Sequence, residues 1–297
     1  AILQDKTFKR VVNDEAIADF FAFEHLLGNE TLFKGISVLP PASILICCKD
    51  KFSIKHYWDF NYEEKAFPED YYVEELVKRF KKAVSIRMEG EHRKGLFLSG
   101  GLDSRTILAA AGGKLDTFTF GVEGSREAKF ARIVANALGA KNEFLELEQN
   151  YVPRYAEKAM YLTDGMVNIL HFHVISLLDK IRDRVGIIFD GLAFDLLLGG
   201  SFLVSQIMRS SNDELPAVLF RKTNTLFREG TARQLFVKDY YQKIKDVPFQ
   251  SLGKELEKIT DENPANRSDY FFLQNHVRRQ TFMGPLYYRS QIEYRAP

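Results

Sequence analysis

The chain has 297 residues, of which 45% are hydrophobic, so it is long enough for one large folded domain or two smaller ones. Its 41 basic and 40 acidic residues nearly balance, which argues against a nucleic-acid-binding or membrane-surface protein. The longest uncharged stretch, residues 165–178, is too short to span a bilayer, and no signal-peptide pattern is visible.

Short strand-like runs and turn signals mark residues 1–60, which predicts a small β-containing segment at the N-terminus. The two cysteines, Cys47 and Cys48, follow the apolar run 44–46 and are expected on a strand. Without any Cys-x-x-Cys motif, they favour a reduced, cytoplasmic protein.

From Tyr71 onward, helical periods alternate with short apolar runs, as is typical of an α/β sheet. The first predicted helix is amphipathic and ends at Gly90. Its expected inward positions recur at three- and four-residue steps: Tyr72, Val73, Leu76, Val77, Phe80 and Val84.

Four apolar runs are predicted to be strands of one parallel sheet: residues 95–98, 117–120, 144–147 and 187–189. A helix over 125–138 is expected to begin at a Ser125 cap, to end at Gly139 and to turn Phe130 inward. After Ser201 the chain is mostly helical in pattern. We therefore expect an α/β fold, with helices on both faces of the parallel sheet and a helical C-terminal part that closes the site.

The segment Ser99-Gly100-Gly101-Leu102-Asp103-Ser104 joins the first of these strands to the next helix. Two glycines before a helix N-terminus bring backbone N–H groups to one point, which favours a bound phosphate. Ser99 and Ser104 add hydroxyl donors, and Asp103 adds a carboxylate suited to Mg²⁺. The alternative is a plain turn in which Asp103 or Ser104 only caps the helix.

The string SGGLDS resembles the pyrophosphate-binding loop of N-type ATP pyrophosphatases, most closely that of asparagine synthetase and its relatives. The resemblance implies an adenine nucleotide alpha-hydrolase-like, Rossmann-like fold, with ATP and Mg²⁺ as cofactors. Such ligases cleave ATP between the α and β phosphates, adenylate a carboxylate and let an amine displace AMP. The implied partners are small-molecule carboxylate and amine substrates, and the oligomeric state stays open.

Weaker matches in the same order extend this resemblance over most of the chain. They are residues 31–36, 39–41, 57–59, 121–127, 131–132, 134–135, 138–139 and 289–297. We expect residues 1–60 to be a remnant of the tail of a class II glutaminase domain, and residues 61–297 to form the synthetase-like ATP pyrophosphatase domain. Glutaminase domains of this class use an N-terminal cysteine, whereas this chain begins with Ala1. We therefore expect a fragment of a longer protein, without a working glutaminase.

The resemblance also assigns roles to residues that follow other strands. Backbone groups of Leu98 and Phe120 are expected to contact the adenine edge. Asp190 and Gly191 are expected to contact the nucleotide, Gly191 through a close backbone approach. Asp195 keeps the position of a second magnesium carboxylate and would form the catalytic pair with Asp103. The alternative for this segment is an apolar helix with one capping acid.

Two departures from the family pattern affect the expected chemistry. Leu192 stands where asparagine synthetase has a glutamate that assists the amine step, and a leucine cannot accept a proton. We therefore expect weak or absent asparagine synthesis, with another acceptor or amine served instead. Pro285 stands where relatives place a lysine. Arg278 or Arg279 would replace that lysine only if the register shifts, and the alternative is an exposed basic pair.

Two functions of other classes stay open. One is a catalytically degenerate nucleotide-binding module, which the lost glutamate favours. The other is an RNA-modifying adenylating enzyme of the same superfamily, against which the near-neutral charge argues. His171 and His173 lie two residues apart, so they would not share a helix face, and we expect core or partly exposed histidines rather than metal ligands.

Overall fold

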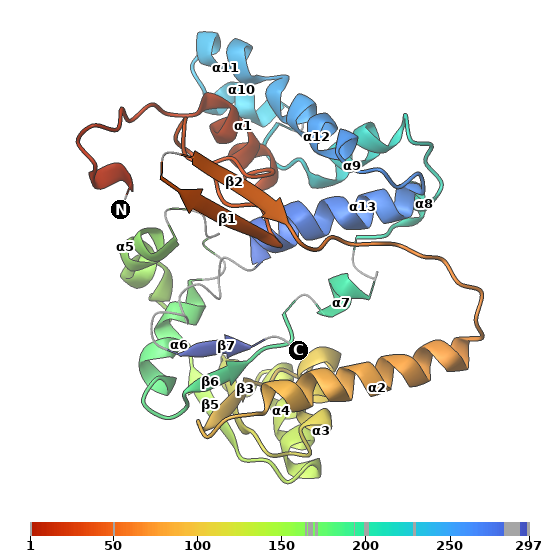
Figure 1. Cartoon of the computed structure of the whole chain (residues 1–297). Helices are drawn as coiled ribbons and strands as arrows, with labels where there is room; N and C mark the ends of the chain where they lie inside the picture. The colour runs from red at the N-terminus through yellow and green to blue at the C-terminus, as the bar shows by residue number, and fades with distance from the viewer. Residues whose placement is uncertain are drawn as a thin grey trace. The chain divides into compact units, whose positions relative to one another are not determined.

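The computed structural model describes residues 2–49, 51–163, 165, 169, 172–192, 194–198, 202–227, 230–281 and 292–295. The chain divides into two compact units (Figure 1). One comprises Ala1–Glu63 and Gly199–Gln280, and the other comprises Glu64–Leu198 and Thr281–Pro297. The assignment of residues 1–60 to a glutaminase remnant and of residues 61–297 to a synthetase-like domain stays a prediction.

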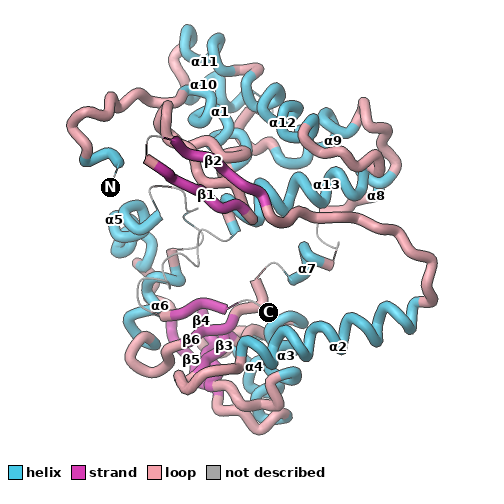
Figure 2. The backbone as a smooth tube through the Cα atoms, in the orientation of Figure 1, coloured by secondary structure: helices cyan, strands magenta, loops and turns pink. Residues whose placement is uncertain are grey.

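The second unit is built on a five-stranded parallel sheet with the order β5-β4-β3-β6-β7 (Figure 2). Its strands are β3 (Lys94–Phe97), β4 (Asp116–Gly121), β5 (Asn142–Glu146), β6 (Ile187–Phe189) and β7 (Glu293–Arg295). The parallel sheet and four of its strands are as the sequence predicts. β7 is an addition, because three residues without an apolar run give no strand signal.

Helices cover both faces of this sheet, which confirms the expected architecture. They are α2 (Glu69–Arg87), α3 (Leu102–Ala110), α4 (Arg126–Ala137), α5 (Tyr151–Thr163) and α6 (His173–Ile181), and a short α7 (Phe194–Leu197) follows β6. Leu96 and Leu98 belong to the core cluster shared with α2, α3 and α4, whereas Phe97 belongs to the cluster shared with α5 and α6. This alternation is that of a strand buried on both faces.

The inward faces of two helices differ from the prediction. Along α2 only Val84 is buried, and Val73 remains 52% exposed. In α4 the buried residues are Ala128, Ala131 and Ala135, while Phe130 is exposed. Small side chains let α4 approach its neighbours closely, so the alanines take the core positions and the larger Phe130 lies outside them. The ends of α4 are as predicted: the Ser125 side chain accepts a hydrogen bond from Ala128 N, and Gly139 has φ +67°.

The first unit combines a small antiparallel sheet with helices from both ends of its sequence. Its elements are η1 (Ile2–Gln4), α1 (Asp14–Phe23), β1 (Ser43–Cys48), β2 (Lys51–His56), α8 (Ser205–Met208), α9 (Leu215–Thr223), α10 (Thr231–Leu235), α11 (Lys238–Ile244), α12 (Val247–Glu257), α13 (Pro264–Phe272) and the π-helical η4 (Leu273–Val277). Both cysteines lie on β1, as predicted, and are exposed. Within the described residues, no helix combines the length and the apolarity that a bilayer crossing needs.

Candidate functional site

The loop from Ser99 to Gly101 connects the end of β3 to α3 in the order that the sequence predicts. Two hydrogen bonds to β4 fix the end of the strand. Leu98 N donates to the Phe118 carbonyl at 2.9 Å, and Thr119 Oγ1 donates to the Leu98 carbonyl at 2.8 Å. The loop therefore begins from a backbone position that the sheet holds rigidly.

The two serines of the loop bind each other across it. Ser104 Oγ accepts a hydrogen bond from Ser99 N at 3.1 Å, and the two hydroxyl oxygens lie 3.1 Å apart. Ser99 Oγ also accepts from Gly101 N at 3.1 Å. These hydroxyls hold the shape of the loop, whereas the first N–H groups of α3 have no acceptor within their own helix, as at any helix start. The phosphate contact expected of the loop amides stays a prediction, and it concerns these helix-start N–H groups.

Two glycines allow the walls of the site to approach one another. A Cβ at Gly100 would lie 2.7 Å from the Phe130 Cβ, so α4 packs directly on the loop. A Cβ at Gly191 would lie 2.7 Å from the Asp103 Cβ. The turn after β6 therefore contacts the first turn of α3, and Gly191 makes the close backbone approach at Asp103.

Three carboxylates gather at this point: Asp103 on α3, Asp190 after β6 and Asp195 on α7. Burial raises the pKa of Asp103, and the charge of Asp195 raises it further. Burial also raises the pKa of Asp190 to about 7, and the charge of Asp103 adds to the increase. Hydrogen bonds from the N–H groups of Gly191 and Leu192 act in the opposite direction and lower this pKa. Like charges that destabilise one another in this way favour a bound cation.

The donor set fits Mg²⁺ shared with phosphate oxygens. In the described part of the chain, no three His, Cys, Asp or Glu side chains are arranged to hold a metal ion by themselves. Magnesium usually takes one or two carboxylates and completes its shell with water and phosphate oxygens. Asp103 and Asp195 match that requirement, whereas a metal cage made only of protein ligands is not present among these residues.

Phe120 lies where β4 nears its end, and its ring points into an aromatic cluster. Its centroid is 5.1 Å from that of His173, with the rings stacked at 28°, and 5.6 Å from that of Phe97. His173 is partly buried and contacts Tyr151 as well. His171 lies outside the described residues. The backbone contact expected of Phe120 stays a prediction.

Arg105 is a residue of the site that sequence reasoning missed. Its Nε donates to the Gly101 carbonyl and its Nη2 to the Gly100 carbonyl, each at 3.0 Å. Because the C=O and N–H of a trans peptide point in opposite directions, holding these carbonyls also fixes where the N–H groups point. The available signal was an arginine directly after the loop motif, within reach of carbonyls four and five residues earlier.

The alternative of an exposed basic pair is wrong, whereas replacement of the family's lysine by Arg278 or Arg279 stays a prediction. Arg279 is 2% exposed and donates to the Glu30 carbonyl at 2.6 Å and to the Gly28 carbonyl at 3.3 Å. Arg278 donates to the Asn29 side chain at 2.6 Å. The pair therefore lies within the first unit, where both arginines bind the turn at residues 28–30.

Other predicted family segments are described only in part. Pro285, Gly199 and Gly200 lie outside the described residues, as do residues 289–291 and 296–297. Within the last segment, Glu293–Arg295 forms β7. Arg295 donates to the Arg87 carbonyl at 2.5 Å and to Glu293 Oε1 at 2.7 Å. These contacts attach β7 to the end of α2.

Residues 75–292 match the model of the family described as asparagine synthase. The chain belongs to the asparagine synthase family. This membership agrees with the strand–loop–helix geometry around Ser99 and with the carboxylates beside it.

Two relatives illustrate how far the similarity to asparagine synthetases extends. Asparagine synthetase [glutamine-hydrolyzing] 1 of Bacillus subtilis is 24% identical over 196 residues, which cover 64% of this chain and 31% of that protein. A Methanocaldococcus jannaschii protein with the provisional name asparagine synthetase [glutamine-hydrolyzing] 2 is 25% identical over 201 residues, 65% of this chain and 39% of that protein. The chain thus spans about a third and about two fifths of their lengths.

Among solved structures, an NH3-dependent NAD synthetase from Campylobacter jejuni is 13% identical. The likeness covers 72% of this chain and 96% of that one, with a TM-score of 0.34. A likeness of this degree adds nothing to the family assignment.

Proposed function

We propose that this member of the asparagine synthase family is an ATP-dependent, amide-forming ligase that adenylates a carboxylate. The carrying observation is the meeting of the loop Ser99–Ser104 with Asp103, Asp190 and Asp195 at the carboxyl ends of β3 and β6. Ligands of open parallel sheets bind at this edge. A backbone-amide cradle beside acidic side chains suits a metal-bound polyphosphate.

Each part of the site has a distinct role in this proposal. A carboxylate oxygen of the substrate attacks the α-phosphorus, and the bond to the bridging oxygen of pyrophosphate breaks. The N–H groups at the start of α3 receive the departing pyrophosphate, and their fixed orientation stabilises the charge that develops. Asp103 and Asp195 would hold Mg²⁺, which neutralises phosphate charge. The amine then attacks the acyl carbon and displaces AMP.

The adenine end of the nucleotide is assigned to backbone groups. Leu98 is 1% exposed and its N–H donates to the Phe118 carbonyl, so only its carbonyl, which can accept a second hydrogen bond beside that from Thr119, is a candidate for a contact with a base. Phe120 turns its ring toward His173, which leaves the same role to its backbone. Asp190 and Gly191 would line the opposite side, next to Asp103.

The acceptor is proposed to differ from aspartate. Leu192 follows Gly191 directly and offers neither a proton acceptor nor a charge for the amine step. Robust formation of asparagine from aspartate, ammonia and Mg-ATP would contradict this assignment.

The same leucine favours a second candidate, a nucleotide-binding module without turnover. Both candidates require Mg-ATP to bind at the loop Ser99–Ser104. They differ in whether any carboxylate accepts the adenylyl group.

A screen with two readouts separates the candidates. The chain is incubated with Mg-ATP and a panel of carboxylates and amines, while equilibrium binding of ATP and release of pyrophosphate and AMP are measured. Equimolar pyrophosphate and AMP with one acceptor supports the ligase. Binding without release across the panel supports the module, and the absence of ATP binding contradicts both. Asp103→Ala is the control that should abolish metal-dependent binding and leave the fold intact.

A further inference from the structure

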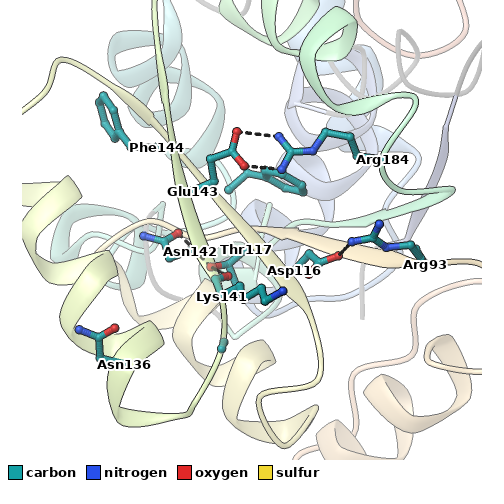
Figure 3. A pocket seen from close by; sticks show the side chains of 11 residues that line it. Arg93, Asp116, Thr117, Asn136, Lys141, Asn142, Glu143, Phe144 and Arg184 are labelled. Atoms are coloured by element: carbon teal, nitrogen blue, oxygen red, sulfur yellow. Dashed lines mark hydrogen bonds and ion pairs between the residues drawn. The ribbon is translucent and has the colours of Figure 1, made fainter.

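A hollow of about 670 Å³ lies at the amino ends of the sheet strands (Figure 3). Arg93 precedes β3, Asp116 begins β4, Asn142 begins β5, and Arg184 comes shortly before β6. The phosphate loop follows the other end of β3, so this hollow and the proposed nucleotide site lie at opposite edges of the sheet. No residue of the hollow has a role in the proposed reaction.

Hydrogen bonds to the strands hold the polar floor of the hollow. The Asn142 side-chain amide lies 2.9 Å from Thr117 Oγ1 and 3.0 Å from Thr119 Oγ1. Thr117 Oγ1 is also 2.8 Å from the Lys141 carbonyl. Because Thr117 and Thr119 both lie on β4, the Asn142 side chain has a fixed position, as a built binding site requires.

The guanidinium of Arg184 is held in one plane beside the hollow. It forms two hydrogen bonds with the Glu143 carboxylate and lies 5.1 Å from the centre of the Phe118 ring (Figure 3). The hydrogen bonds of this pair lower the pKa of Glu143 and raise the pKa of Arg184, so both groups are ionised. A charged, oriented guanidinium is a preferred partner of phosphate oxygens.

Arg93 and Lys141 add cations on the other side. Arg93 Nη2 donates to Asp116 Oδ2 at 2.6 Å, which leaves its other guanidinium nitrogens without a contact to a described carboxylate. The exposed Lys141 side chain has no hydrogen-bond or ion-pair partner in the described part of the chain. Its ammonium group is therefore available to a ligand.

Positive charge is concentrated at this edge. A second hollow of about 390 Å³ shares Arg93, Asp116 and Lys141 with the first. The basic residues that line the two hollows are Arg93, Lys94, Lys114, Lys141 and Arg184, and the acidic ones are Asp116 and Glu143. Three more basic than acidic residues thus gather here, although the whole chain carries a net charge of only +1.

We propose that this hollow is a second ligand site, which binds a small phosphomonoester between Arg93, Lys141 and Arg184. Its volume is in the range of small-molecule sites. The carboxylates of Asp116 and Glu143 flank the cations, so a compact anion fits between them, whereas the continuous phosphates of a nucleic acid would meet both negative charges.

Binding of ribose 5-phosphate to the ¹⁵N-labelled chain, followed by amide chemical shifts, tests the proposal. We expect saturable shifts in residues 93–94, 114–118 and 141–144. Lys141→Glu should raise the dissociation constant about tenfold or more, because one favourable charge becomes a repulsive one. The control Lys129→Glu reverses an exposed charge on α4 outside the hollow and should leave the constant unchanged.

Three outcomes would overturn this second site. They are the absence of saturable shifts at millimolar ribose 5-phosphate, shifts confined to Ser99–Ser104, and equal weakening by Lys141→Glu and Lys129→Glu. A nucleic-acid fragment that binds the wild type more tightly than ribose 5-phosphate, with the same shifted residues, would also contradict the assigned ligand class. None of these results depends on whether the loop Ser99–Ser104 binds ATP.

Discussion

Gly191 lies so close to Asp103 that a Cβ on this glycine would be 2.7 Å from the Asp103 Cβ. The same Cβ would be 3.1 Å from Ser104 N, in the first turn of α3. The turn after β6 therefore supports the residue to which we assign the magnesium ion. Any side chain at position 191 must displace Asp103 or the helix start.

Gly191→Ala is expected to lower the free energy of unfolding by about 1–3 kcal/mol through overpacking, and to weaken Mg-ATP binding because Asp103 moves. Urea unfolding and calorimetric titration measure the two effects. Gly253→Ala is the matched control, since a Cβ at this position of α12 would meet nothing within 4 Å. In a helix interior that change should stabilise the chain by about 0.5–1 kcal/mol. A Gly191→Ala variant that equals the wild type in both measurements would contradict the packing.

Arg105→Ala is expected to weaken the binding of pyrophosphate and of ATP about tenfold, while the affinity for AMP stays unchanged. The reason is that the guanidinium holds the carbonyl of Gly101, whose peptide carries the Leu102 N–H, the first of the α3 amides that are assigned to the pyrophosphate. Arg105→Lys, with one ammonium group for two carbonyls, should recover only part of the affinity. Arg132→Ala removes an exposed charge from α4 and serves as the control. Equal losses for AMP and pyrophosphate would indicate a general structural role instead.

Asp103→Asn is expected to change the metal dependence of nucleotide binding in two directions. Loss of a carboxylate ligand should weaken the binding of Mg-ATP. Loss of a negative charge should strengthen the binding of metal-free ATP at the same loop. Titrations with Mg²⁺ and with a chelator measure both constants. Asp183→Asn, at a side chain that is 87% exposed, is the control. If Asp103→Asn weakened both forms of ATP alike, the assignment of Asp103 as a metal ligand would fail.

The free energy of unfolding is expected to fall as the pH rises from about 6.5 to 8. Burial raises the folded-state pKa of Asp190 to about 7 and that of Asp19 to about 8, while an unfolded chain has values near 4. The folded state therefore holds these protons more tightly and loses that advantage as the pH passes through the raised values.

The buried His25 makes the free energy of unfolding rise with pH below about 6.5, so the test begins at that pH. Burial lowers the pKa of His25 to about 3, so its contribution to stability increases up to the ordinary histidine value near 6.5 and then stays constant. Urea unfolding at several pH values should show a smaller slope in Asp19→Asn than in the wild type above pH 6.5. An unchanged slope in Asp19→Asn would show that Asp19 is already ionised in the folded state, so that its pKa is not raised.

The sequence predicted the sheet and the loop between β3 and α3 because their signals are local. Apolar runs of three or four residues, a serine cap and glycine ends all act within a few positions, and β3, β4 and β6 follow them. The gathering of Asp103, Asp190 and Asp195 depends on strand order, but parallel strands bring their carboxyl ends to one edge, so the sequence could indicate that edge as well.

The predictions that were wrong concern which side chains are buried. Burial depends on partners that lie far away in the sequence. The apolar positions of α2 have helical spacing, yet most of them stay exposed because helical periodicity does not tell how far along the helix the packing extends. Arg278 and Arg279 bind carbonyls about 250 positions earlier in the chain. No pattern within a window of sequence can report such a partner.

The contacts of Arg279 also decide how the chain could be shortened. Its guanidinium is enclosed and binds the carbonyls of Gly28 and Glu30, while Asn275 accepts a hydrogen bond from Gly28 N at 2.7 Å. Excising the first sixty residues would remove every one of these carbonyl partners of Arg279. A boundary drawn at residue 60 would thus cut through the first unit, whereas one that keeps residues 1–63 together with residues 199–280 would leave these contacts whole.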